Sequence, residues 1–140
     1  MEDERKPTTE DTFFMYGSLR RGMYNHYILK DKSKFISNAK ISRFKLLSFG
    51  SFPAVIPSDD ENDFVVGELF KITDDEVITS IDRMELNYGY KRTFTKAIDE
   101  FGNEHDIIFY EYTKPQYCEN AEVVESGDWV KFKEGDKHGR

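Results

Sequence analysis

The sequence predicts an α+β fold whose mainly antiparallel sheet is able to curl into a barrel. Segments with the pattern of strands number about six and outnumber the two or three short segments with the pattern of helices. Strands and helices do not alternate regularly, which argues against a doubly wound parallel sheet. The length of 140 residues suits one domain with one core.

The domain is expected to span residues 12–132. The twelve Phe and eight Tyr residues of the chain supply an aromatic-rich core for it. Residues 1–11 and 133–140 are polar and charged and lack apolar periodicity, so both are expected to be flexible tails.

The first half of the domain contains several short strands joined by turns. Residues 12–16 predict a buried strand, and Asn25 is expected to cap a short helix. Residues 35–49 predict one bent strand or two. Two prolines within residues 52–57 indicate an edge segment or a constrained loop, and the four acids within residues 58–63 indicate a solvated loop.

The second half contains the clearest helix and a hairpin. Residues 64–72 predict a strand, and residues 73–76 have the spacing of a capping box at the start of a helix. Strands at residues 90–98 and 105–112 predict a hairpin. The predicted helix places these apolar residues at helical intervals: Val77, Ile78, Ile81 and Met84.

Composition restricts the partners of the protein. A net charge of −7 without a basic block argues against nucleic-acid binding. No apolar run approaches the roughly 20 residues of a membrane span, and no signal peptide opens the chain. Cys118 is the single cysteine, so no internal disulfide is expected. A cytoplasmic location without membrane or nucleic-acid partners is the resulting expectation.

The common metal and cofactor motifs are missing from the sequence. The three histidines and one cysteine have no zinc spacing, and the acidic loops lack the calcium pattern. The sequence also contains no phosphate-binding glycine loop and no Gly-x-Ser-x-Gly elbow. The sequence therefore predicts no metal and no cofactor.

The turn after the first predicted strand is the first candidate binding element. Gly17 follows Tyr16 abruptly and can adopt backbone angles that a side chain forbids. Ser18 adds a hydroxyl and little bulk. Such a turn can direct consecutive N–H groups into one concavity that binds anions. The alternative is a strand that simply ends in a turn.

Glu85 is the candidate acid or base. It lies at the end of the predicted helix, beside the aromatic-rich turn at residues 87–90. A carboxylate partly removed from water has a raised pKa and can move protons in both directions. The alternative is a solvated glutamate at a helix end. Arg92 on the next strand is able to pair with a carboxylate, and the alternative is an exposed strand arginine.

An ordered set of short motifs resembles the γ-glutamylcyclotransferase-like (AIG2-like) superfamily. Each motif alone has low specificity, whereas their order and spacing from residue 13 to residue 129 are specific. The set consists of Tyr16-Gly17-Ser18-Leu19-Arg20, Gly22, Asn25-His26, Phe52-Pro53-Ala54, Asp82-x-x-Glu85, Tyr90, Arg92 and Gly127-Asp128-Trp129.

The resemblance implies a small β-barrel flanked by short helices. It also implies an enzyme that releases 5-oxoproline from a γ-glutamyl amine or γ-glutamyl amino acid. The sequence has no signal for the oligomeric state, and a monomer or weak homodimer is the expectation. Glu85 matches the catalytic acid/base, and the tyrosines Tyr90 and Tyr110 are placed to assist binding. The turn expected to bind the glutamyl end comprises Tyr16, Gly17, Ser18 and Leu19.

Two alternatives to the cyclotransferase remain open at this point. One is a non-catalytic module that binds or senses a small molecule, and the other is a different amide- or ester-cleaving enzyme on the same fold. Retention of Glu85 beside an intact turn favours catalysis. The group released from the substrate is expected to contact the loops at residues 48–57 and 114–120.

Overall fold

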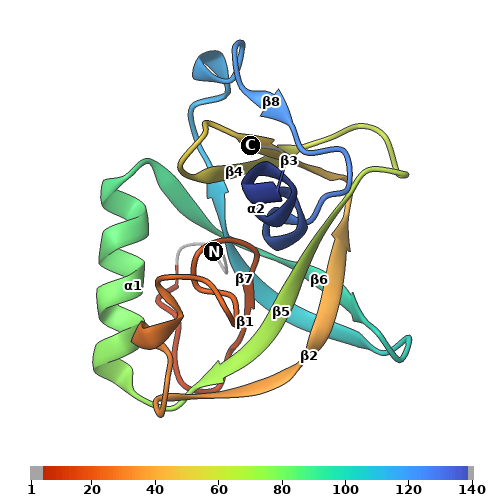
Figure 1. Cartoon of the computed structure of the whole chain (residues 1–140). Coiled ribbons are helices and arrows are strands. Elements are labelled where there is room, and N and C mark those ends of the chain that lie inside the picture. Colours follow the sequence, from red (N-terminus) through yellow and green to blue (C-terminus); the bar gives the residue numbers. More distant parts are fainter. Residues whose placement is uncertain (1–4, 139–140) are drawn as a thin grey trace.

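The structure, a computed structural model, describes residues 5–138 of the chain (Figure 1). Strands and helices alternate irregularly along this part of the chain. In chain order its elements are β1 (Thr12–Met15), η2 (His26–Ile28), β2 (Ser33–Ser42), β3 (Phe44–Ser48), β4 (Pro53–Pro57), β5 (Phe64–Ile72), α1 (Asp75–Asn87), β6 (Tyr90–Asp99), β7 (Glu104–Tyr112), η3 (Pro115–Tyr117), β8 (Glu122–Val123) and α2 (Trp129–His138).

Five strands form a closed barrel in the order β1-β5-β2-β6-β7. Every neighbouring pair is antiparallel except β1 and β7, which close the barrel as a parallel pair through Phe13 and Ile108. Helix α1 lies along one side of the barrel and contacts β6 and β5 (Figure 1). The predicted α+β fold with a small mixed barrel flanked by short helices is confirmed.

A second sheet, in the order β4-β3-β8, lies beside one end of the barrel together with α2 (Figure 1). Of the two possibilities for residues 35–49, two strands are correct: β2 and β3 separate at Arg43, whose φ is +67°. Strand β4 pairs only with β3 and is an edge strand, as its two prolines predict.

Helix α1 begins one residue later and ends later than the sequence indicates. Its N-cap is Asp74 rather than Thr73, and the Asp74 carboxylate accepts hydrogen bonds from the N–H groups of Glu76 and Val77. The helix continues to Asn87, so Glu85 lies in its last turn rather than at its final residue. Ile78 and Ile81 are buried, as their spacing predicts.

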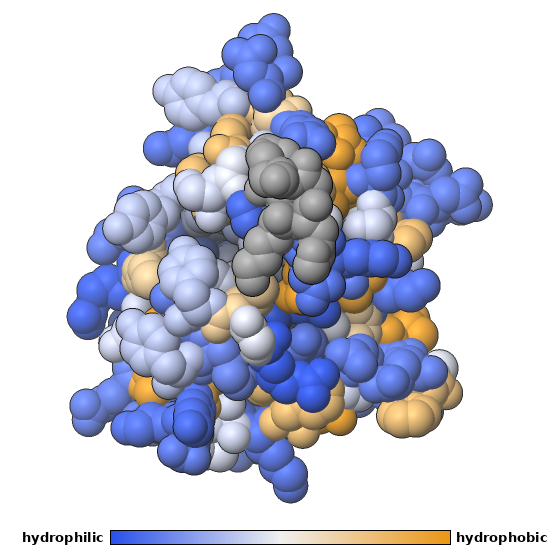
Figure 2. All heavy atoms as spheres, viewed as in Figure 1, coloured by the Kyte–Doolittle hydropathy of each residue, from blue (hydrophilic) through white to orange (hydrophobic). Residues whose placement is uncertain are grey.

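The apolar core consists of two clusters. One joins residues of the barrel strands to β3, β4 and α2, and it includes Phe14, Leu46, Val55, Phe109 and Trp129. The other joins residues of the barrel strands to α1, and it includes Phe13, Leu29, Phe70, Ile81 and Tyr110. Hydrophilic side chains cover most of the face seen in Figure 2. None of the helices between residues 5 and 138 is long and apolar enough to span a membrane.

Two local expectations need correction or remain open. The Asn25 side chain makes no capping hydrogen bond to η2 and instead donates to the Ser18 hydroxyl. Helix α2 was not predicted, and it extends through His138 into the proposed C-terminal tail. The flexibility of residues 1–11 and 133–140 stays a prediction, and residues 1–4 and 139–140 lie outside the described part of the chain.

Candidate active site

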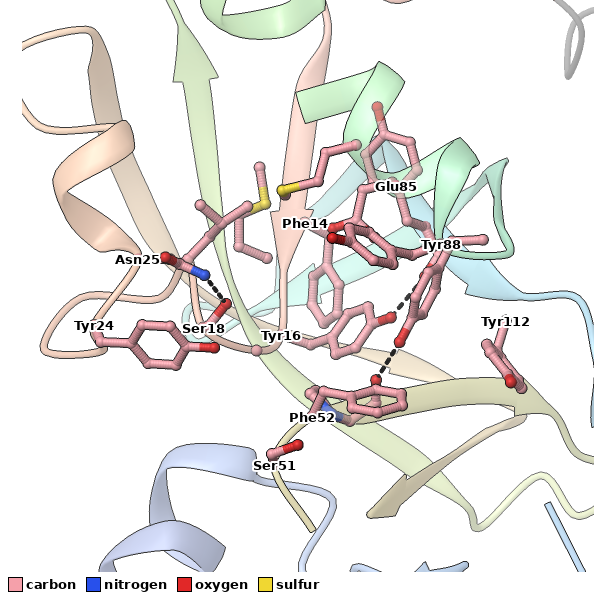
Figure 3. Close-up of a pocket in the computed structure, with 17 residues that line it drawn as sticks. Phe14, Tyr16, Ser18, Tyr24, Asn25, Ser51, Phe52, Glu85, Tyr88 and Tyr112 are labelled. Atoms are coloured by element: carbon pink, nitrogen blue, oxygen red, sulfur yellow. Dashed lines mark hydrogen bonds between the residues drawn. The ribbon is translucent and has the colours of Figure 1, made fainter. Parts of the chain in front are cut away.

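A pocket of about 480 Å³ opens where β1, α1 and the segment before β4 meet (Figure 3). In Figure 3 the side chains of Tyr16, Glu85 and Phe52 come from these three regions and lie around a common space. All seven residues predicted for the site line this pocket: Tyr16, Gly17, Ser18, Leu19, Glu85, Tyr90 and Tyr110.

The turn after β1 presents unused backbone donors. The Arg20 N–H donates to the Gly17 carbonyl and closes the turn. Within residues 5–138, the N–H groups of Gly17, Ser18 and Leu19 have no hydrogen-bond acceptor. Because buried backbone donors are almost always paired, adjacent unpaired donors beside a pocket provide a site for an anionic or carbonyl oxygen.

Gly17 is required by close packing rather than by an unusual backbone angle. It is absent from the glycines with positive φ. A Cβ atom at position 17 would lie 2.9 Å from Cγ of Pro53, at the start of β4. The turn and β4 therefore approach so closely that any side chain at position 17 would displace one of them.

A network of buried charged side chains holds the turn in place from the side away from the pocket. The Glu68 carboxylate on β5 accepts from the Arg20 Nε at 3.2 Å and from the Arg21 N–H at 2.9 Å. Arg20 also donates to Asp128 at 2.8 Å, and Asp128 accepts from the N–H of Lys131 in the first turn of α2. Arg20 and Glu68 are both buried, so this network ties the turn to the barrel and to α2.

Glu85 projects from the last turn of α1 into the pocket. Its carboxylate has no hydrogen-bond or ionic partner among residues 5–138. Surrounding protein removes most of its water, and this burial raises the pKa of the Glu85 carboxyl from 4.5 to about 7. The carboxyl is therefore able to gain and lose a proton near neutral pH.

Asp82, one helical turn earlier on α1, has the opposite environment. Its carboxylate accepts from Arg92 Nε at 2.7 Å and Nη2 at 3.1 Å, and from the Tyr110 hydroxyl at 2.9 Å. These three hydrogen bonds tie the carboxylate to Arg92 on β6 and to Tyr110 on β7. Of the two possibilities for Arg92, pairing with a carboxylate is correct, and its partner is Asp82.

Three tyrosine hydroxyls in the pocket donate their protons to the protein itself. Tyr16 donates to the Tyr110 carbonyl at 2.7 Å, Tyr90 to the Pro53 carbonyl at 2.6 Å, and Tyr110 to Asp82. Burial raises the pKa of all three phenols, so they remain protonated. Each hydroxyl already donates its proton to an acceptor in the protein. It can therefore interact with a ligand only through its lone pairs, which accept hydrogen bonds.

The pocket therefore has a donor side and an acceptor side. The three backbone N–H groups of the turn form the donor side, and Glu85 with the tyrosine lone pairs forms the acceptor side. An amino-acid head group, with a carboxylate and an ammonium on one carbon, has matching chemistry. Among the described residues, no three His, Cys, Asp or Glu side chains are grouped to hold a metal.

Sequence reasoning missed much of the aromatic wall of the pocket. The additional aromatic lining residues Tyr24, Phe52, Tyr88 and Tyr112 come from separate segments, and no spacing rule links them. Tyr88 lies three residues after the predicted site residue Glu85, and this closeness was the one signal in the sequence that could have identified it. Of the two loops expected to contact the released group, residues 51–53 line the pocket and residues 114–120 do not.

His26 lies outside the pocket lining. Its Nδ1–H donates to the Leu19 carbonyl at 2.9 Å, so it supports the turn from behind.

Comparisons with known proteins show which family the chain resembles. A sequence model of the family described as "Gamma-glutamyl cyclotransferase, AIG2-like" matches residues 13–131. A Methanocaldococcus jannaschii protein with the provisional name gamma-glutamylcyclotransferase is 31% identical over 121 residues, which are 86% of this chain and 96% of that protein. The gamma-L-glutamyl-butirosin B gamma-glutamyl cyclotransferase of Niallia circulans is 25% identical over 126 residues, which are 86% of this chain and 76% of that protein.

The fold has close counterparts among solved structures. An uncharacterised protein from Pyrococcus horikoshii superposes with a TM-score of 0.68 at 23% identity, covering 91% of this chain and 97% of that protein. This likeness concerns the fold alone. From the family match across residues 13–131 and the 31% identity to the archaeal relative, the chain belongs to the gamma-glutamyl cyclotransferase, AIG2-like family.

Proposed function

We propose that the protein is a γ-glutamyl cyclotransferase that releases 5-oxoproline from a γ-glutamyl amide, with Glu85 as the general acid/base. The observation that carries this proposal is the unpartnered Glu85 carboxyl, with a pKa near 7, in the same pocket as the turn's free N–H groups. A purely binding pocket has no need of a carboxyl that titrates near neutral pH.

The substrate of such a reaction carries its own nucleophile. The α-amino nitrogen attacks the γ-carbonyl carbon and forms a five-membered ring, and the bond from that carbon to the amide nitrogen then breaks. Intramolecular attack removes much of the entropic barrier, an effect worth up to about 7–11 kcal/mol in well-oriented systems. The protein therefore needs no serine or cysteine nucleophile.

Glu85 would pass protons from the α-nitrogen to the departing nitrogen. Its carboxylate takes one proton from the α-ammonium and makes that nitrogen nucleophilic, and the resulting carboxylic acid protonates the departing amine as its bond to the carbonyl carbon breaks. The ring nitrogen gives up a second proton as it becomes the lactam N–H of 5-oxoproline, and the amine takes up this proton and leaves as an ammonium. A pKa of about 7 allows one carboxyl to serve both steps at neutral pH. The overall reaction consumes no water and needs no oxidant or reductant.

The two sides of the pocket would orient the glutamyl group for this attack. The N–H groups of Gly17, Ser18 and Leu19 would hold the α-carboxylate. The lone pairs of the Tyr16 and Tyr90 hydroxyls would accept from the α-ammonium beside Glu85.

Incubation of the purified protein with a panel of γ-glutamyl amines and γ-glutamyl amino acids tests the proposal. Chromatography would identify 5-oxoproline and the free amine in equal amounts. Free glutamate in place of 5-oxoproline would indicate an amide hydrolase instead. Thermal stabilisation by these compounds without any product would support the binding or sensing module.

A further inference from the structure

The pocket is larger than its proposed glutamyl ligand requires. Its volume of about 480 Å³ falls in the roughly 300–1,000 Å³ range of sites that enclose drug-sized ligands. The donor turn and Glu85 account for the recognition of the glutamyl head. The remaining space is available to the group attached to the amide nitrogen, and the residues around it determine which group fits.

Aromatic rings dominate the outer part of this pocket. Tyr24 and Tyr88 line it while remaining 72% and 73% exposed, so both lie at its opening. Phe52, which is 44% exposed, and Tyr112 also line the pocket. We call these four residues the aromatic mouth: Tyr24, Phe52, Tyr88 and Tyr112. In Figure 3, Tyr24 and Tyr112 lie on opposite sides of the view, with Phe52 between them.

The Phe52 ring is held in place by a neighbouring aromatic ring. It stacks on Phe49 with ring centroids 5.0 Å apart and an interplanar angle of 23°. Phe49 in turn contacts Tyr112 at 5.5 Å, and Tyr112 meets Tyr90 edge-to-face at 5.3 Å. This row of rings fixes the orientation of Phe52, whose exposed part faces the pocket. A planar ring entering the mouth would find preorganised aromatic partners.

The lining of the mouth has no charged side chain to pair with the released group. Among residues 5–138, the pocket lining contains no Lys, Arg, His or Asp, and Glu85 is its one carboxyl. Lys133 lies beside the mouth, but its ammonium donates to the Gly50 carbonyl at 2.9 Å and lies over the Trp129 ring, so an anionic group would find no cation in the lining of a protein of net charge −7. A cationic group would have only Glu85 as a counter-ion, and Glu85 is needed for proton transfer. An uncharged group avoids both costs.

We propose that the aromatic mouth binds a leaving amine that carries an aromatic ring and no charged group besides the amine itself, so that γ-glutamyl arylalkylamides are the preferred substrate class. This specificity rests on the proposed cyclotransferase activity. Aromatic contacts with the mouth should raise kcat/KM about 2–10-fold over a non-aromatic group of equal size, the usual worth of a ring–ring contact beyond its burial.

Four γ-glutamyl amides separate the contributions of ring and charge. Their leaving amines are 2-phenylethylamine, 2-cyclohexylethylamine, 1,4-diaminobutane and phenylalanine. The cyclohexyl amine has the same carbon skeleton as the phenyl amine and is more apolar, so burial alone favours it. Phenylalanine differs from 2-phenylethylamine by one carboxylate. The measurement is kcat/KM for 5-oxoproline release, and the expected order places the phenylethyl amide first.

Phe52→Leu tests the mouth directly, because leucine stays apolar and removes the ring. It should abolish the preference for the phenyl over the cyclohexyl amide, measured as the ratio of their kcat/KM values. Phe101→Leu is the matched control, since Phe101 is 77% exposed in the β6–β7 turn and lies outside the pocket. This control should retain the preference.

The outcomes distinguish this specificity from the underlying activity. Equal rates for all four amides, or a preference for the diamine or phenylalanine derivative, would overturn the aromatic specificity and leave the cyclotransferase activity standing. A preference that persists in Phe52→Leu would also overturn it. Failure of every amide to yield 5-oxoproline would reject the proposed function, and the specificity with it.

Discussion

Asp82 and Glu85 lie three residues apart on α1, and their carboxyls have opposite environments. Asp82 accepts three hydrogen bonds, two from the Arg92 guanidinium and one from the Tyr110 phenol. Glu85 has no such partner among the described residues, and burial raises the pKa of its carboxyl to about 7. Two carboxyls on one helix are thereby separated into an anchor that is hydrogen-bonded to two strands and a group that exchanges protons.

Glu85→Gln should reduce turnover about 10²–10⁴-fold, the usual worth of general acid–base catalysis. Glutamine keeps the shape of the side chain and cannot accept and return a proton at neutral pH. Substrate affinity and the fold should be largely retained, as measured by calorimetry and circular dichroism. Asp82→Asn is the control, and it should lower stability more than rate because it weakens the contact with Arg92. Loss of activity in Asp82→Asn with full activity in Glu85→Gln would reverse the assignment.

The pH dependence of rate should follow Glu85. In the free enzyme kcat/KM should rise as pH increases through about 7, because the ionised carboxylate is the form that accepts the proton. A pH–rate profile from pH 5 to 9 measures this. A rising limb centred near the ordinary glutamate value of 4.5 would show that Glu85 is not the titrating base.

Stability should change with pH in the opposite direction to the rate, because the contribution of Glu85 falls as pH rises from about 4.5 to about 7. The folded state holds the Glu85 proton up to about pH 7, whereas the unfolded state releases it near pH 4.5. Between these values the folded state binds more protons, so the contribution of this residue to unfolding free energy falls as pH rises. Urea denaturation at several pH values should show a smaller decline in Glu85→Gln. An identical decline in both proteins would contradict the burial of the carboxyl.

Gly17→Ala should disturb the pocket through packing alone, because it adds one methyl group and no polar group. The new Cβ would meet Cγ of Pro53 at 2.9 Å and displace the segment whose carbonyl accepts the Tyr90 hydroxyl. Overpacking of this kind costs about 1–3 kcal/mol of unfolding free energy. KM should rise as well. Gly135→Ala is the matched control, because a Cβ at Gly135 has open space around it and stability should not fall.

Glu68→Gln should show that the buried ion network positions the turn. An amide NH2 group would face the Arg20 guanidinium, and Arg20 would lose part of its charge compensation; breaking a buried pair costs up to about 3–5 kcal/mol. KM should rise while the pH–rate profile stays centred near 7. Asp99→Asn, which breaks the pair with His105 in the β6–β7 hairpin, is the control for lost stability alone. An unchanged KM in stable Glu68→Gln would remove the network from binding.

Removal of residues 1–11 and 133–140 should leave cooperative unfolding intact. The removed contacts include the Arg5–Asp11 ion pair, in which Arg5 is half-exposed, and such pairs contribute about 0–1 kcal/mol. The buried Trp129 of α2 is retained. Differential scanning calorimetry of a 12–132 fragment is the measurement. Loss of a cooperative transition would show that one of these segments completes the core.

The elements that the sequence predicted correctly are those with a local signal. Strand β5 and the β6–β7 hairpin have alternating or continuous apolar residues bounded by turns, and α1 has a capping residue and an apolar stripe. The site residues came from the resemblance, since neither Tyr16 nor Glu85 carries a distinctive spacing of its own. Closure of the barrel, the Glu68–Arg20 contact and the aromatic mouth depend on long-range pairing, which local pattern does not encode.

The parallel contact between β1 and β7 also affects how the protein folds. Tyr16 and Tyr110, which are 94 residues apart in the sequence, meet across this junction through a hydrogen bond. Such long-range pairing forms late and slows folding. The pocket therefore exists only after the first and last barrel strands have joined. A ligand spanning the turn and Glu85 should hold this junction closed, slow unfolding, and protect the amides of both strands from hydrogen exchange.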